Sequence, residues 1–257
     1  MVLSVGQIQI FLMILARVGG LFIETPVFSA RGIPTLAKIT IALWLAAAFW
    51  FTIPVASTAA LPMGLMILFM IKEVLIGFMI GFMCFLLFNG IQGAGDIIDL
   101  QMGLSVATTL DPIFGAVVTI IGRLAFMMAT LIFLIIDGHH MLIRALHASF
   151  TILPLGGSLT FSPSFVFQII DGGARMWLIA IQLSAPIVLV IFLSDFAFGI
   201  VSRVAPQVNV FMLGFQVKPA LGLIALMVTL PIFVSHMANL VPEMAQAVSH
   251  LLISVRP

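Results

Sequence analysis

Several segments of this chain are apolar over a length that can cross a lipid bilayer, and this feature limits the folds open to it. A spanning helix needs about 20 mostly apolar residues, and lipid accepts only helices or closed barrels. Only 7% of the 257 residues are charged, too few to cover the surface of a soluble protein. We therefore predict an all-α integral membrane protein with a single membrane domain over residues 1–257. The expected helical segments are 7–24, 36–54, 62–91, 113–136, 174–201 and 219–235, followed by a shorter apolar tail at 236–255.

Ionisable side chains lie inside or beside these apolar segments. Lys72 and Glu73 are adjacent, so we expect them to point to different faces of a helix and to find partners elsewhere. Asp171 and Arg175 are four residues apart with the acid first, which is the favoured order for a helical ion pair. A charge at membrane depth is costly unless it is paired or hydrated. Buried structural ion pairs are our preferred interpretation of these four residues, and a proton or ion relay is the alternative.

Polar residues form two stripes at helical spacing, one in the middle of the chain and one near its C-terminal end. A polar stripe in lipid must face protein or water, so we predict inter-subunit contacts or the wall of an aqueous passage. The alternative is a pair of amphipathic helices at the membrane surface, although such helices are usually richer in Lys and Arg. The first polar stripe is Asn89, Gln92, Asp96 and Asp99, with Gln101 just after it, and the second is His236, Asn239, Glu243, Gln246 and His250.

The segment "GLSVATTLDPIFG" follows the first polar stripe. Its Gly103, its Ser and Thr residues and the pair Asp111-Pro112 argue against a continuous helix, yet many of its other residues are apolar. An apolar irregular segment at membrane depth is tolerated only where it is buried in protein or lines a cavity. The residues themselves favour equally a hydrophobic constriction of a pore and an ordinary turn between two spans.

We recognise no catalytic set in the sequence. His140 and His147 are seven residues apart, so a metal site is conceivable, but no H-E-x-x-H motif is present. Asp137 before Gly138 is more simply the cap that opens a helix. Cys84 is expected to be a small buried apolar residue. The sequence thus favours a protein that is not an enzyme and has no metal or cofactor, and its net charge of +1 favours no nucleic-acid partner.

The chain resembles the FliR family of flagellar biosynthetic proteins in four blocks that follow one another in order. They are "GDIIDLQMGLSVATTLDP", "DGHHMLIRAL", "LPLGG" and "RVAPQVNVFMLGFQVKPALGL". The resemblance implies a structural, channel-forming subunit of the flagellar type III protein export gate, in the bacterial inner membrane at the flagellar basal body. It implies FliP and FliQ as partners, FlhB and FlhA nearby, and unfolded flagellar proteins as substrates. The alternatives are a stand-alone secondary transporter and the injectisome homologue in virulence secretion.

The resemblance also implies an architecture and two functional segments. A FliP-like part would cover about 1–173, and a FliQ-like helical hairpin about 174–257, in a helical pore assembly. A loop after the first polar stripe would help to close the pore. The loop residues are Val106, Ala107, Thr108, Thr109, Leu110, Asp111, Pro112, Ile113, Phe114 and Gly115, and the expected hairpin-turn residues are Arg203, Pro206, Gln207, Asn209, Gly214 and Lys218.

Overall fold

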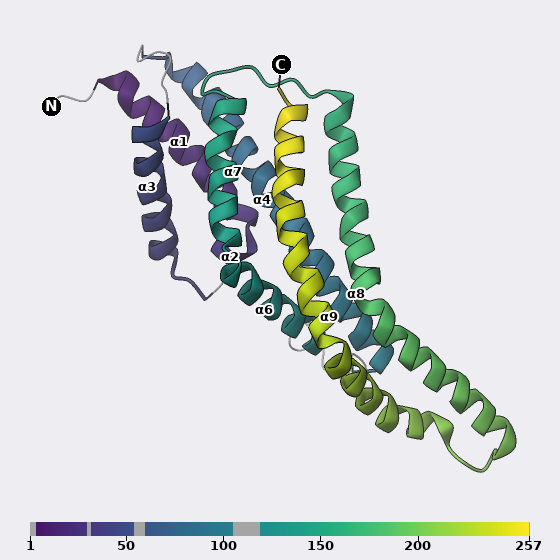
Figure 1. Ribbon diagram of the computed structural model, residues 1–257. Coiled ribbons are helices and arrows are strands. Elements are labelled where there is room, and N and C mark those ends of the chain that lie inside the picture. Colours follow the sequence, from purple (N-terminus) through teal and green to yellow (C-terminus); the bar gives the residue numbers. More distant parts are fainter. Residues whose placement is uncertain (1–3, 30–31, 54–59, 105–118, 257) are drawn as a thin grey trace. The chain divides into compact units, whose positions relative to one another are not determined.

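The computed structural model describes residues 4–29, 32–53, 60–104 and 119–256, and these residues form helices and no strand (Figure 1). Among them, five helices are long and apolar enough to cross a membrane. The predicted class, an all-α integral membrane protein, is therefore confirmed. The helices are α1 (Val5–Glu24), α2 (Pro26–Ser29), α3 (Thr35–Thr52), α4 (Met63–Met102), α6 (Ile120–Ile135), α7 (Gly138–Ile152), α8 (Pro163–Val204) and α9 (Val210–Ser254).

The bounds of several helices differ from the predicted segments. Helix α4 continues to Met102, past the predicted end at 91, and α8 begins at Pro163 rather than at 174. Helix α6 begins at Ile120 rather than at 113. Helix α9 is one helix from Val210, where we predicted a separate span and tail. Prolines within α8 and α9 do not break these helices, because neighbouring groups in a membrane bundle can satisfy the backbone that proline leaves free.

The chain forms two compact units, and helices α4, α8 and α9 each contribute one part to both. Unit 1 comprises Met1–Leu86, Asp137–Gly172 and Val241–Pro257, and unit 2 comprises Leu87–Ile136 and Gly173–Leu240. The division into a FliP-like part and a FliQ-like hairpin stays a prediction.

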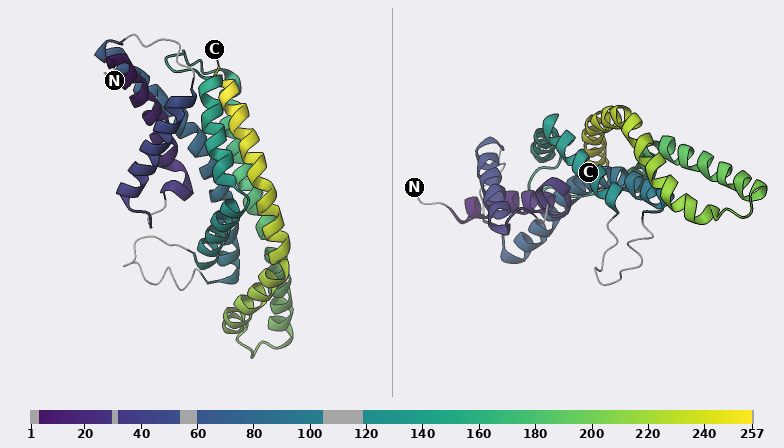
Figure 2. Two further views of the ribbon diagram at one scale, coloured as in Figure 1. Left: turned by 60° about the vertical axis from the view of Figure 1, so that its left-hand side comes forward. Right: turned by 90° about the horizontal axis from the view of Figure 1, so that it is seen from below.

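Helix α1 packs on α3 and on α4 within unit 1 (Figure 2). A capping box begins α1, because the Ser4 hydroxyl accepts from the Gln7 N–H while the Gln7 side chain accepts from the Ser4 N–H. The rings of Phe11 and Trp50 meet at 5.7 Å between α1 and α3. A Cβ at Gly77 of α4 would overlap the backbone of α1, so this crossing requires a residue without a side chain.

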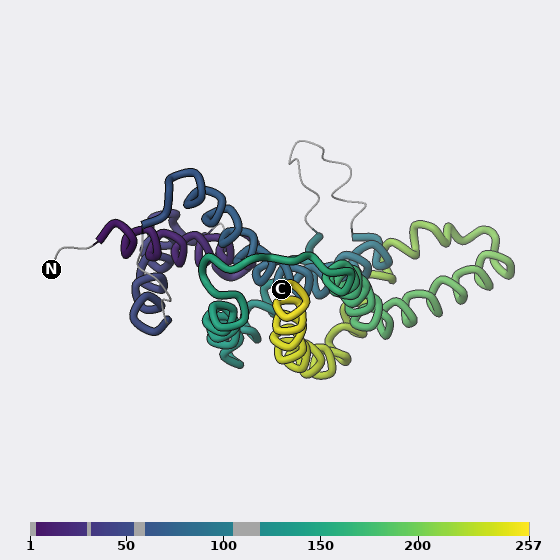
Figure 3. Tube along the Cα trace, turned by 90° about the horizontal axis from the view of Figure 1, so that it is seen from above, coloured from purple at the N-terminus to yellow at the C-terminus, as the bar shows by residue number. Residues whose placement is uncertain are grey.

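The end of α9 in unit 1 lies beside the connection between α7 and α8, as Figure 3 shows from above. Ser162 Oγ donates to the Ser254 carbonyl at 2.7 Å, and the Thr160 N–H donates to the Val255 carbonyl at 3.3 Å. These bonds give polar partners to a connection that has no regular secondary structure.

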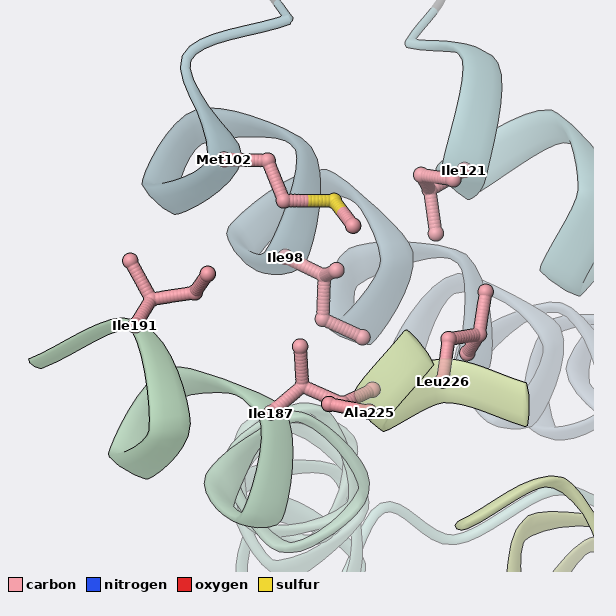
Figure 4. Packing of buried hydrophobic residues seen from close by; sticks show 7 residues of the cluster. All are labelled: Ile98, Met102, Ile121, Ile187, Ile191, Ala225 and Leu226. Carbon is pink, nitrogen blue, oxygen red and sulfur yellow. The ribbon is translucent and has the colours of Figure 1, made fainter. Parts of the chain in front are cut away.

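Unit 2 has a core cluster of buried apolar residues where the end of α4 and the start of α6 meet α8 and α9 (Figure 4). Met102 from α4 is 0% exposed, and a Cβ at Gly222 of α9 would collide with its side chain. The cluster therefore fixes the end of α4 against the hairpin formed by α8 and α9. Its members are Ile98, Met102, Ile121, Ile187, Ile191, Ala225 and Leu226.

Candidate functional site

The first polar stripe leads to a well-formed end of α4. Gly103 has a φ of +79°, its N–H donates to the Leu100 carbonyl at 3.1 Å, and the Leu104 N–H donates to the Asp99 carbonyl at 3.2 Å. This pair of bonds is a Schellman motif, in which a glycine in the left-handed region ends a helix. The glycine that argues against a continuous helix in the sequence thus marks the C-terminus of α4.

Two carboxylates of the stripe bind the beginning of α6. Thr119 is the N-cap of α6, with its hydroxyl accepting from the Gly122 N–H at 3.2 Å and donating to Asp96 Oδ1. Asp99 Oδ1 accepts from the Ile121 N–H at 3.2 Å. The first N–H groups of a helix have no partner within the helix, and its N-terminus carries a partial positive charge. Asp99 therefore gives a free N–H of α6 an acceptor, Asp96 accepts from the N-cap hydroxyl, and both carboxylates complement the partial positive charge of the helix start.

The backbones of α4 and α6 approach each other closely at this point. A Cβ at Gly95 would lie 2.5 Å from the Gly122 Cα, so neither helix leaves room there for a side chain. Asp99 is 0% exposed, and its Oδ2 has no hydrogen-bond partner among the residues that the structure describes. We name this contact the stem: Gly95, Asp96 and Asp99 of α4 with Thr119, Ile121 and Gly122 at the start of α6.

The stem holds the two helix ends on either side of residues 105–118. The predicted loop, Val106 to Gly115, lies outside the described residues. The structure thus describes how the chain enters and leaves this segment. Its role in closing a pore stays a prediction.

A pocket of about 400 Å³ lies in unit 2 between the end of α4 and the turn of the hairpin. Asp195 of α8 and Lys218 of α9 contribute an ion pair of 2.5 Å to its lining, and these side chains are 41% and 27% exposed. Phe198, Phe211 and Phe215 supply much of its apolar wall. The pocket therefore combines an apolar lining with a partly exposed ion pair.

The predicted hairpin-turn residues fall partly in the turn and partly in the helices. Pro206, Gln207 and Asn209 lie between α8 and α9, and Asn209 Oδ1 accepts from the Met212 N–H at 3.2 Å at the start of α9. Arg203 belongs to the last turn of α8. Gly214 and Lys218 lie within α9 and line the pocket.

The two polar stripes differ in exposure. In the first, Asn89, Gln92 and Asp96 are partly buried and Asp99 is buried, while Gln101 is exposed at the end of α4. In the second, His236 is partly buried, and the rest of the stripe is exposed along α9. Contact with other subunits or with a pore stays a prediction for both stripes. The exposed members of the second stripe are Asn239, Glu243, Gln246 and His250.

A buried group of charges lies in unit 1, between α1 and α4. Arg17 Nη2 lies 2.5 Å from Glu73 Oε2, and both side chains are 0% exposed. The other Nη of Arg17 donates to Ser149 Oγ at 3.0 Å, and its Nη2 also donates to the Leu153 carbonyl at 2.9 Å. Lys72 Nζ lies 3.5 Å from Glu73 Oε1, so adjacent residues that we expected to point apart both reach this site. Arg17 makes the shortest contact to Glu73 in this group, but it was not among the predicted pairs. The sequence does show that Arg17 lies inside an apolar segment.

The other predicted pair, Asp171 and Arg175, lies in the first part of α8. Each of these residues has an interaction in the structure. Their pairing with each other stays a prediction.

The histidines near the start of α7 are arranged differently from the expectation. Helix α7 begins at Gly138 as expected, but the Asp137 side chain makes no cap hydrogen bond to the helix. The predicted capping role of Asp137 is therefore wrong. His147 Nε2 lies 3.2 Å from Thr52 Oγ1, whereas His140 Nδ1 lies 3.1 Å from Asp137 Oδ1.

Comparison with known proteins identifies relatives over nearly the whole chain. The family described as "Bacterial export proteins, family 1" matches residues 8–244. The flagellar biosynthetic protein FliR of Bacillus subtilis (strain 168) is 32% identical over 247 residues, covering 95% of each chain. The protein of the same name from Escherichia coli (strain K12) is 31% identical over 237 residues, covering 92% of this chain and 86% of that one. The secretion system apparatus protein SsaT of Salmonella typhimurium is 30% identical over 164 residues, covering 64% of this chain and 63% of that one.

Proposed function

The chain belongs to the bacterial export proteins, family 1, and from this premise we propose that it is a structural and channel-forming subunit of the flagellar type III export gate. Membership makes it a component of a multi-subunit secretion export apparatus. Similarity to FliR over 95% of both chains carries the flagellar assignment, since the match to SsaT covers 64% of this chain. The gate lies in the bacterial inner membrane, and unfolded flagellar proteins pass through it.

The uneven burial of the long helices supports a place inside an assembly. In the most apolar stretch of α4, 67% of the residues are buried within the chain, compared with 33% in α8 and 22% in α9. Four of the five residues of the second polar stripe lie exposed on α9, and lipid tails cannot satisfy polar side chains. We infer that FliP and FliQ subunits cover the hairpin of α8 and α9, with FlhB and FlhA nearby.

The stem supports a role for the predicted loop in closing the pore. A loop that moves while a substrate passes needs fixed ends, because otherwise its displacement would disturb the helices that carry it. Asp96 and Asp99 bind the start of α6, and the Schellman motif ends α4 in a defined direction. We propose that residues 106–115 form the closure, with the stem as its base.

The assembly is tested by extracting the native complex in detergent and measuring its intact mass, with its components identified by peptide sequencing. We expect this chain in a large complex with several copies of other small hydrophobic proteins. A lone chain or a homodimer would contradict the export gate and favour a stand-alone transporter.

The closure is tested by deleting residues 106–115 and measuring ion conductance across membranes that contain the assembled complex. We expect normal assembly and increased conductance. The matched control is Thr151→Ala, an exposed position of α7 outside the loop, the stem and the hairpin, and we expect it to leave conductance unchanged. Unchanged conductance in a correctly assembled deletion complex would contradict the closure while leaving the gate assignment intact.

A further inference from the structure

Asp137 has an unusual backbone conformation at the start of α7. Its φ of 58° is the one positive φ of a non-glycine residue in the described part of the chain. Its carboxylate does not cap α7 but lies 3.1 Å from His140 Nδ1. The left-handed backbone therefore places a carboxylate beside an imidazole rather than on the free N–H groups of the helix.

His139 brings a second imidazole to the same place. The ring centroids of His139 and His140 are 4.2 Å apart. His139 Nδ1 is buried and has no hydrogen-bond partner among the described residues. A buried polar atom without a partner is costly, so its presence points to a ligand that satisfies it.

We propose that Asp137, His139 and His140 bind a divalent transition-metal ion. One potential ligand atom from each residue lies within 4.8 Å of the other two. Two imidazole nitrogens and one carboxylate oxygen form a ligand set that suits Zn²⁺ and its first-row neighbours, whereas Mg²⁺ and Ca²⁺ prefer oxygen ligands. The side chains of Asp137 and His140 are 71% and 58% exposed, so water can complete the coordination.

The charge at the site favours a cation despite its place at a helix N-terminus. The N-terminus of α7 contributes a partial charge of roughly +0.5, which is smaller than the full negative charge of Asp137. The imidazoles bind a metal in their neutral form and add no positive charge. The site shares no residue with the stem, and the proposal does not rest on the export function.

The experiment titrates Zn²⁺ into the purified full-length chain, prepared in detergent without a histidine tag, in competition with a colorimetric zinc chelator. We expect the wild-type chain to bind one more Zn²⁺ than a His139→Gln/His140→Gln variant. Asp137→Asn keeps the size of the side chain but removes its charge. We expect it to weaken binding by at least about 10-fold, because changing a direct ligand should cost no less than losing an outer-shell partner does.

The matched control is His147→Gln/His250→Gln, which removes the same number of histidines outside the site. We expect this control to bind Zn²⁺ as the wild type does. Equal zinc binding by both double variants and the wild type would overturn the proposal. Adding Co²⁺ to the unaltered chain gives a second measurement. We expect the intense visible bands of four- or five-coordinate cobalt. A spectrum that shows nothing but the weak bands of hydrated Co²⁺ would overturn the proposal.

Discussion

Glu73→Gln removes the negative charge that Arg17 and Lys72 share in the buried group of charges in unit 1. Arg17 and Glu73 are both 0% exposed and lie 2.5 Å apart, and Lys72 Nζ lies 3.5 Å from the other carboxylate oxygen. The substitution leaves two cations without the acid between them. Arg17 keeps its bonds to Ser149 and the Leu153 carbonyl, but neither of these groups carries a charge.

The expected loss follows from the complete burial of the pair. Removing one partner of a buried ion pair costs about 3–5 kcal/mol, because the remaining charge is left without compensation. For a chain of this size, 1 kcal/mol shifts the unfolding midpoint by roughly 2–4 °C, so we expect Tm to fall by roughly 6–20 °C. Arg17→Met/Glu73→Met removes both charges of the pair. We expect its loss of stability to be smaller than the sum of the losses of Arg17→Met and Glu73→Met, measured singly, by about 0.5–3 kcal/mol.

The assay is thermal unfolding of the purified full-length chain in detergent, followed by circular dichroism at helical wavelengths. The matched control is Lys218→Met, which breaks the partly exposed pair with Asp195. Exposed pairs contribute about 0–1 kcal/mol, so this control should lower Tm by at most roughly 4 °C. The reasoning fails if Glu73→Gln lowers Tm no more than the control does. It also fails if the stability losses of Arg17→Met and Glu73→Met add up to the loss of the double variant.

Three further predictions concern the stem and the neighbouring part of α4. Gly95→Ala should destabilise the chain by about 1–3 kcal/mol in the same assay, because its Cβ would meet the backbone at Gly122. The control Gly93→Ala should be neutral or stabilising by up to about 1 kcal/mol, since its Cβ would lie in ordinary contact at 3.5 Å. Asp99→Ala should destabilise the chain by about 1–3 kcal/mol, because it leaves the Ile121 N–H without its acceptor. Asp99→Asn keeps an acceptor oxygen and should destabilise the chain less. Equal losses in the two variants would contradict the hydrogen-bond role. Cys84, which is 0% exposed, should resist a maleimide reagent in the folded chain and react fully in SDS, and rapid labelling of the folded chain would contradict its burial.

The sequence predicts the class of the fold well because hydropathy and length suffice for it. It predicts helix bounds less well where glycine and proline have tertiary roles. Gly95 appears in the sequence as a residue that loosens a helix, yet α4 continues through it, because its missing side chain allows close contact with α6. The predicted span over 219–235 begins at Pro219, yet Pro219 lies inside α9. A single glycine or proline costs about 1–3 kcal/mol in a helix, and packing against neighbouring helices can outweigh that amount.

The candidate site could be predicted only in part for a related reason. The spacing of Asp96 and Asp99 shows that they share a helix face, but it does not show that this face meets the start of α6. Thr119 before an apolar run is a recognisable N-cap signal, and it would have placed the start of α6 correctly. The partner of Glu73 lies 56 residues away in Arg17, and no local pattern connects residues at that distance.

The polar residues of this apolar chain separate into two groups by how they are satisfied. Arg17 and Glu73 find partners within the chain at 0% exposure, and Asp99 finds one for one of its two carboxylate oxygens, so these residues contribute to the fold of a single subunit. Glu243 and Gln246 lie exposed on α9, where lipid would leave them unsatisfied and only water or another protein can satisfy them. Substitutions in the first group should therefore reduce the stability of the isolated chain. Substitutions in the second group should leave that stability unchanged and act on assembly, which gives the proposed export gate a test that does not depend on the closure of its pore.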